Sequence, residues 1–146
     1  MLRSLHEVLR APASSVPALY CTAAADELGD AIDTAGFGAR EAVFYIGNAG
    51  DTWSSTDKIV LVVQDSDDDG GTDPYADVAA GYIDGTLASL ESSSADDNQE
   101  YRYGLRPQVK RYVKLGFNAS GTHTTGTIMS SAIILGEALD CPTDNP

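Results

Sequence analysis

The sequence predicts an all-β fold, a single-domain β-sandwich or jelly-roll-like barrel with a short N-terminal arm or helix. The chain has 146 residues, a length typical of one domain. Its short apolar segments are separated by turn-forming clusters, a pattern typical of sandwiches and barrels. Its acidic residues are sixteen aspartates and six glutamates, and aspartate favours turns and is a poor helix former.

The N-terminal segment differs from the rest because its apolar residues have helical spacing. Residues 2–10 place one apolar stripe on a short helix that Pro12 ends, formed by Leu2, Leu5, Val8 and Leu9. A helix this short is marginal alone, so we expect the stripe to dock on its own domain or on a partner. Residues 11–17 are expected to be extended. We therefore divide the chain into an arm (1–17), a sandwich (18–139) and a tail (140–146).

The sandwich segment has a period of two from its first strand onward. The expected strands are residues 19–22, 41–47, 58–65, 101–105, 109–117 and 127–135. Residues 58–65 are apolar on both faces, which predicts a central strand. In residues 109–117 the side chains of Val113 and Phe117 share an apolar face and those of Lys110 and Lys114 a cationic face.

The connecting segments are polar or irregular. Residues 29–38, 48–55 and 118–126 are expected turns, and residues 65–74 and 91–99 are expected loops. Residues 75–90 are ambiguous, because their apolar spacing allows a broken helix while Gly81 and Gly85 weaken it.

The charge of the chain limits its partners. Nine basic residues face 22 acidic ones, so the net charge is −13 and the isoelectric point about 4.2. This field repels nucleic acids and anionic membranes, and we expect neither as a partner. No segment approaches the length of a transmembrane helix and residues 1–5 lack a secretory signal, so we expect a soluble, unexported protein.

The acidic loop contains a partial calcium-binding pattern. Asp65, Asp67 and Asp69 alternate before Gly70, as in a calcium loop. The twelfth position is Ala76 rather than the glutamate that an EF-hand needs, which excludes an EF-hand. A looser cation site that also includes Asp73 stays open beside the alternative of a solvated acidic hairpin.

The basic residues are clustered as well. Five of the nine lie within thirteen residues: Arg102, Arg106, Lys110, Arg111 and Lys114. Fourteen acids precede them between Glu41 and Glu100, so nucleic-acid binding is disfavoured. Two interpretations stay open: a solvated face or pairing with the chain's own acids, and docking on an acidic protein surface.

No motif indicates an enzyme. The chain lacks a nucleophile elbow, a phosphate loop and a dinucleotide fingerprint, so we predict neither catalysis nor a cofactor. His6 and His123 are expected on the surface, and Cys21 and Cys141 as inert thiols, although the sequence leaves open whether they pair.

The order of motifs resembles that of small structural proteins encoded in the head-gene region of tailed bacteriophages. The pieces are Asp33–Gly36, Ala42–Gly47 (AVFYIG), Val60–Asp69 with its Gln-Asp-Ser-Asp-Asp end, Lys110–Leu115 (KRYVKL) and Ala132–Gly136, and they span about residues 28–136. The loops at 69–74 and 91–99 depart from the pattern by their length.

The resemblance implies a capsid decoration, or cement, protein. Such a protein binds the outside of an HK97-type shell in symmetric clusters and reinforces it. The implied partners are the major capsid protein and further copies of the chain, with a trimer favoured, and the implied location is the capsid surface after synthesis in the host cytoplasm. The expected contacts are the stripe Leu2, Leu5, Val8 and Leu9 and the cations Arg106, Lys110, Arg111 and Lys114. A tail or head–tail accessory subunit and a calcium-stabilised binding module are the alternatives.

Overall fold

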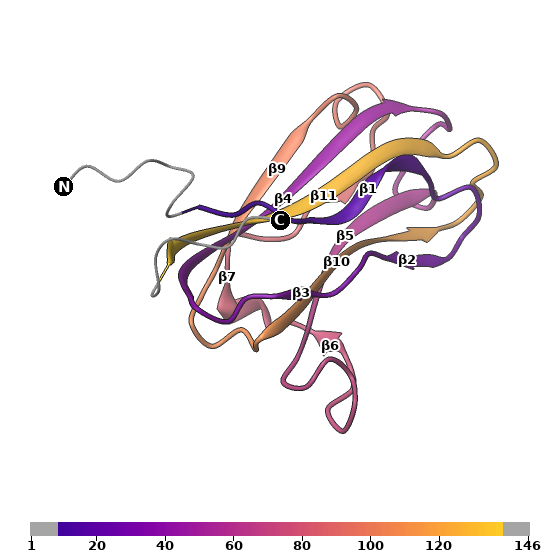
Figure 1. Cartoon of the computed structure of the whole chain (residues 1–146). Helices are drawn as coiled ribbons and strands as arrows, with labels where there is room; N and C mark the ends of the chain where they lie inside the picture. The colour runs from indigo at the N-terminus through magenta and orange to yellow at the C-terminus, as the bar shows by residue number, and fades with distance from the viewer. Residues whose placement is uncertain (1–8, 139–146) are drawn as a thin grey trace.

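The fold is a sandwich of two antiparallel sheets, given by a computed structural model that describes residues 9–138 (Figure 1). The five-stranded sheet has the order β1 (Ala13–Tyr20), β11 (Thr127–Ala138), β4 (Phe37–Ala49), β9 (Glu100–Leu105) and β7 (Ile83–Asp84). The six-stranded sheet has the order β2 (Asp26–Leu28), β10 (Tyr112–Ser120), β5 (Lys58–Ser66) and β6 (Ala76–Asp77), with β3 (Ile32–Asp33) beside β10 and β8 (Ser89–Leu90) beside β5. The predicted fold class is confirmed.

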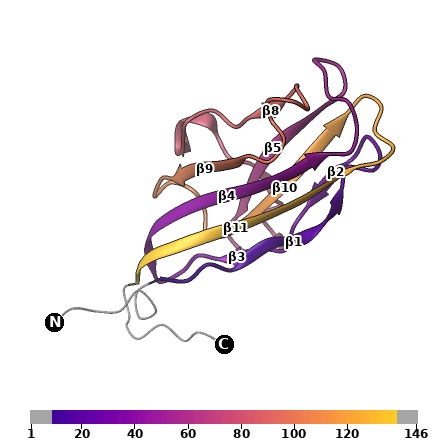
Figure 2. The ribbon, with the colours of Figure 1, turned by 90° about the horizontal axis from the view of Figure 1, so that it is seen from above.

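The two sheets lie in layers, with β9, β4, β11 and β1 side by side in front of β5 and β10 (Figure 2). The predicted strands 41–47, 58–65, 101–105 and 127–135 fall within β4, β5, β9 and β11. Along β5 the side chains alternate between buried and half-buried, with Ile59, Leu61 and Val63 turned to the core. The strand is central, as its apolar composition predicts.

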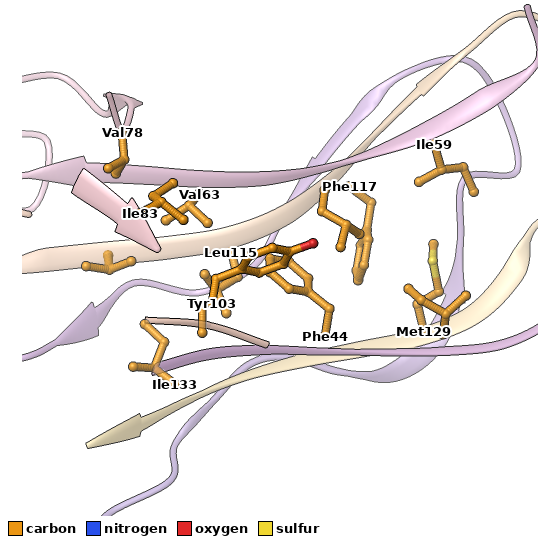
Figure 3. Packing of buried hydrophobic residues seen from close by; sticks show 14 of the residues in the cluster. Phe44, Ile59, Val63, Val78, Ile83, Tyr103, Leu115, Phe117, Met129 and Ile133 are labelled. Atoms are coloured by element: carbon orange, nitrogen blue, oxygen red, sulfur yellow. The ribbon is translucent and has the colours of Figure 1, made fainter. Parts of the chain in front are cut away.

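The core is a single apolar layer between the sheets, and aromatic rings lie at its middle (Figure 3). Phe44 of β4 meets Phe117 of β10 edge to face, with ring centroids 6.0 Å apart. Tyr103 of β9 packs on the other side of Phe44 at 6.1 Å. These contacts join the two sheets, and each such pair adds about 0.5–1.5 kcal/mol beyond area burial.

Strand β1 is longer than the sequence indicates and connects both sheets. It begins at Ala13, so residues 13–17, which the sequence analysis assigned to the arm, pair with β11. The Ser14 hydroxyl donates to the carbonyl of Asp30, between β2 and β3, at 2.8 Å. The same hydroxyl accepts the N–H of Leu115 in β10 at 3.1 Å, so Ser14 is bonded to the six-stranded sheet. The neighbouring Ser15 N–H donates to the Ser131 hydroxyl on β11 at 3.1 Å.

Two other segments differ from their sequence-based description. Residues 75–90 contain no α-helix: they form β6, the 3-10 helix η1 (Ala80–Tyr82), β7 and β8, and so alternate between the two sheets. Strand β10 begins at Tyr112, because residues 106–109 turn first, with the Val109 N–H bonded to the Arg106 carbonyl. Nothing within residues 9–138 is a helix long and apolar enough to cross a membrane.

Candidate docking surface

The side of the five-stranded sheet that points away from the core is mostly uncharged. Directly opposed residues in antiparallel strands point to the same side, which identifies its members. Leu19 pairs with Ile128, Ser130 with Tyr45, and Ala132 with both Ala13 and Val43. We call this side the outer face; on β1, β11 and β4 it consists of Ala13, Leu19, Val43, Tyr45, Ile128, Ser130, Ala132 and Ile134.

The outer face exposes large apolar side chains at one end. Leu19 is 55% exposed, Ile128 62% and Tyr45 44%, and Val16, also on β1, is 63% exposed. Large exposed apolar patches on soluble proteins mark interaction sites. This patch is therefore a candidate contact surface.

The charged residues of this side form its border along β9. Arg102 pairs with Glu100 at 2.6 Å and with Glu41 at 3.6 Å, and these two carboxylates raise the pKa of its guanidinium. Val43, whose cross-strand neighbours are Ala132 and Arg102, is only 1% exposed. On the outer face, between the cross-strand pair Leu19–Ile128 and the pair Ile134–Glu41, Glu41 is the one charged residue that β1, β11 and β4 contribute.

The basic cluster is paired within the chain. Arg106 Nε lies 2.7 Å from Asp84, and Lys110 Nζ lies 2.6 Å from Asp73. The hydrogen bond that Lys110 Nζ donates to Asp73 raises the pKa of Lys110. The structure thus favours pairing with the chain's own acids, one of the two interpretations that the sequence left open.

The other two cations of the cluster also have partners. Arg111 holds Asp33 with two hydrogen bonds of 2.8 and 2.7 Å, which lower the pKa of that carboxyl group. Lys114 Nζ lies 4.3 Å from the centre of the Tyr75 ring. Exposed pairs of this kind contribute little stability, typically below about 1 kcal/mol, but they reduce the positive charge available to a partner.

Arg40 organises the turn that carries these cations, and the sequence analysis did not identify it. Its side chain leaves β4 on the core side and donates to the carbonyl groups of Val109 at 3.0 Å and Arg106 at 3.2 Å. Burial lowers the pKa of its guanidinium, while nearby Asp65 raises it. No local pattern distinguishes Arg40, because its carbonyl partners lie more than sixty residues along the chain.

Three of the four candidate aspartates in the acidic loop, which projects beside β6 (Figure 1), accept hydrogen bonds from different groups. Asp65 accepts the Lys110 N–H at 2.9 Å, Asp69 accepts the Tyr75 hydroxyl, and Asp73 accepts the Asp67 N–H at 2.7 Å. Within residues 9–138 no three side chains of histidine, cysteine, aspartate or glutamate gather as metal ligands. The candidate cation site of Asp65, Asp67, Asp69 and Asp73 is therefore not assembled in the structure.

Asp51 ties the β4–β5 loop to the β10–β11 loop. Its carboxylate accepts the backbone N–H groups of Thr124 at 3.2 Å, Thr125 at 3.0 Å and Gly126 at 2.9 Å. Burial alone would raise the pKa of Asp51, but these hydrogen bonds outweigh it and the pKa is lowered. Asp57 of the same loop accepts the Thr122 N–H at 2.6 Å.

The expectation of a surface position for His123 is wrong. The ring is buried, with Nε2 2.9 Å from the Ser120 carbonyl oxygen and Nδ1 3.9 Å from Asp51. The reason is the attachment of residues 122–126 to Asp51 and Asp57, which folds the β10–β11 loop over the ring.

The remaining predicted residues are inert or lie outside the described part. Cys21 is a buried free thiol whose pKa is raised to about 12, first by burial and then by nearby Glu27. Leu2, Leu5, Val8, His6 and Cys141 lie outside the described residues, and Leu9 is exposed.

A shallow groove of about 380 Å³ lies along β5, lined by Val60, Val62, Val78, Leu87, Asp77 and Asn118 among others. Its polar lining is one carboxylate and one amide, a set that holds no nucleophile paired with a base. The outer face is therefore the feature that best supports a function.

The chain matches no family model, and no curated protein or solved structure is significantly similar to it.

Proposed function

We propose that this chain is a non-enzymatic structural protein that coats the capsid of a tailed bacteriophage and stabilises its shell. The observation that carries the proposal is the outer face, an apolar and nearly uncharged surface on a chain with a net charge of −13. A protein of this kind acts by contact with other protein surfaces. The bacteriophage shell as its location is supported by the sequence resemblance across about residues 28–136.

The charge distribution suits a dense coat. Acidic side chains on the rest of the surface repel neighbouring particles and keep a crowded layer soluble. Arg106, Lys110 and Arg111, which the resemblance implies as shell contacts, already pair with the chain's own aspartates. We therefore assign the shell contact to the arm with Leu2, Leu5, Val8 and Leu9 rather than to the cations.

The test is the number of copies on purified particles of the phage that encodes the chain. Quantitative mass spectrometry compares peptides of this chain with peptides of the major capsid protein. We expect a copy number comparable to that of the shell subunit. A few copies per particle would overturn the decoration role in favour of a tail or head–tail accessory subunit, and absence from the particle would overturn both.

A deletion of residues 1–12 tests the shell contact. The deletion leaves β1 in place, because β1 begins at Ala13. We expect the variant to fold and to bind shells that lack the wild-type chain more weakly than the full chain does. Undiminished binding would contradict the assignment of the arm. Since the deletion also removes Arg10, which pairs with Leu135, circular dichroism of the variant is the control for folding.

A further inference from the structure

We propose that the outer face packs against the same face of a second copy of this chain, around a two-fold axis that runs along β11. This inference rests on the proposed function in one respect, namely that the outer face is a contact surface of the coat. It adds the identity of the partner and a two-fold geometry in place of the trimer that the resemblance implies.

The lack of charge on most of the outer face permits contact with a second, equally acidic copy. A basic partner would be attracted to the carboxylates that cover other parts of the surface. Two copies with a net charge of −13 each repel one another wherever such carboxylates meet. On the outer face, β1, β11 and β4 contribute no charged residue between the cross-strand pair Leu19–Ile128 and the pair Ala132–Val43. Two copies can therefore approach there.

The position of the charged border determines the direction of the axis. Sheets pack face to face with their strands nearly aligned. A two-fold axis along β11 places β11 on β11 and β1 of one copy on β4 of the other. Strand β9, which carries Glu100 and Arg102, then lies beyond β1 of the second copy, and its charges stay in water.

The sizes of the side chains are compatible with this arrangement. Leu19 lies at the same level as Gly47, because Leu19 pairs with Ile128 and a Cβ on Gly47 would lie 2.7 Å from the carbonyl oxygen of that same Ile128. The two-fold axis therefore places a large side chain of β1 over a glycine of β4. Ile128, on the axis, meets its own copy. Tyr45 lies over β1 of the second copy, where it contributes apolar area.

The experiment measures self-association of the purified full chain by sedimentation equilibrium over a range of concentrations. We expect a dimer at micromolar concentration. Ile128→Asp places two carboxylates against each other at the axis and should weaken association about 100-fold or more. The matched control is Leu28→Asp, which adds the same charge at an exposed leucine of β2 on the other sheet and should leave association unchanged. Both variants replace exposed side chains, and thermal unfolding checks that they fold.

Salt distinguishes this contact from a polar one. Salt screens the repulsion between two acidic copies, so it should strengthen association through an apolar face. Association through ion pairs would instead weaken with salt. A monomer at all concentrations, a trimer, weakening by salt, or equal effects of the two substitutions would each overturn the inference.

Cross-linking with a short bismaleimide tests the geometry, because face-to-face sheets lie about 10 Å apart, beyond the reach of a disulfide. With Cys141→Ser as the background, Ser130→Cys lies on β11 near the axis and should be joined to its copy by the reagent. Glu100→Cys, on β9, should stay monomeric in the same reaction. The reverse result would overturn the axis along β11. A chain that is monomeric in solution but abundant on particles refutes this inference alone, and a dimer absent from particles refutes only the proposed function.

Discussion

The hydrogen bonds of Asp51 give the most quantitative prediction, tested by Asp51→Ala. Gly126 is buried, so its N–H would lose its partner without gaining water, at a cost of about 1–3 kcal/mol. Thr124 and Thr125 are exposed and can bond to water instead, so each lost bond costs about 0.5–1 kcal/mol. We expect a loss of about 3 kcal/mol of unfolding free energy in total, or about 10 °C in melting temperature.

The assay is urea unfolding at neutral pH followed by fluorescence of Trp53. Trp53 is the one tryptophan of the chain, and it is buried in the same loop as Asp51. The matched control is Asp30→Ala, which removes the side chain of an exposed aspartate. A loss below about 1 kcal/mol for Asp51→Ala, or equal losses for both variants, would refute the argument from backbone hydrogen bonds.

The pH dependence supplies a second check on Asp51. A carboxyl group with a lowered pKa in the folded state stabilises the protein above its unfolded pKa of about 3.9, and this contribution is lost as the pH falls through the folded value. The stability difference between wild type and Asp51→Ala should therefore be constant near neutral pH and shrink below about pH 4. A difference that grows on acidification would contradict the sign of the pKa shift.

Three further predictions follow from other contacts. Arg40→Met should destabilise the fold by about 2–3 kcal/mol and speed amide hydrogen exchange in the 106–111 turn, because three backbone carbonyls lose a donor; unchanged exchange there would contradict its positioning role. Cys21 should resist iodoacetamide at pH 8 until the protein is unfolded, since its buried thiol has a pKa of about 12; rapid alkylation of the native protein, detected by mass spectrometry, would oppose this. Calcium and a chelator should leave the melting temperature unchanged, because the carboxylates of Asp65, Asp69 and Asp73 already accept internal hydrogen bonds. A bound site at a hundred times its Kd would add about 2.7 kcal/mol.

The sheet strands were predictable because each is encoded locally. Alternation of apolar and polar side chains over 41–47 and 127–135 predicts strands with one buried face, and these residues form parts of β4 and β11. Residues 75–90 were ambiguous for a related reason. They form β6, β7 and β8, which alternate between the two sheets and have two residues each, too few to show a periodic pattern.

The candidate site was less predictable because it depends on distant pairing. The outer face combines residues of β1, β11 and β4, and whether Leu19 lies beside Ile128 depends on a register between opposite ends of the chain. Asp51 and Arg40 bond to backbone groups more than sixty residues away, and any segment offers such groups. Sequence patterns therefore identify side chains that are buried, but not carboxylates or guanidinium groups that hold a remote loop.

The position of β11 has a consequence for synthesis on the ribosome. β11 lies between β1 and β4, so the N-terminal strand has no place in its sheet until residues 127–138 have been made. Until then β4 exposes a thirteen-residue edge to other nascent chains. Residues 58–120, by contrast, already contain β5 and β10, which pair with each other. A truncated product that lacks β11 should thus fold half of the sandwich and aggregate through the other half.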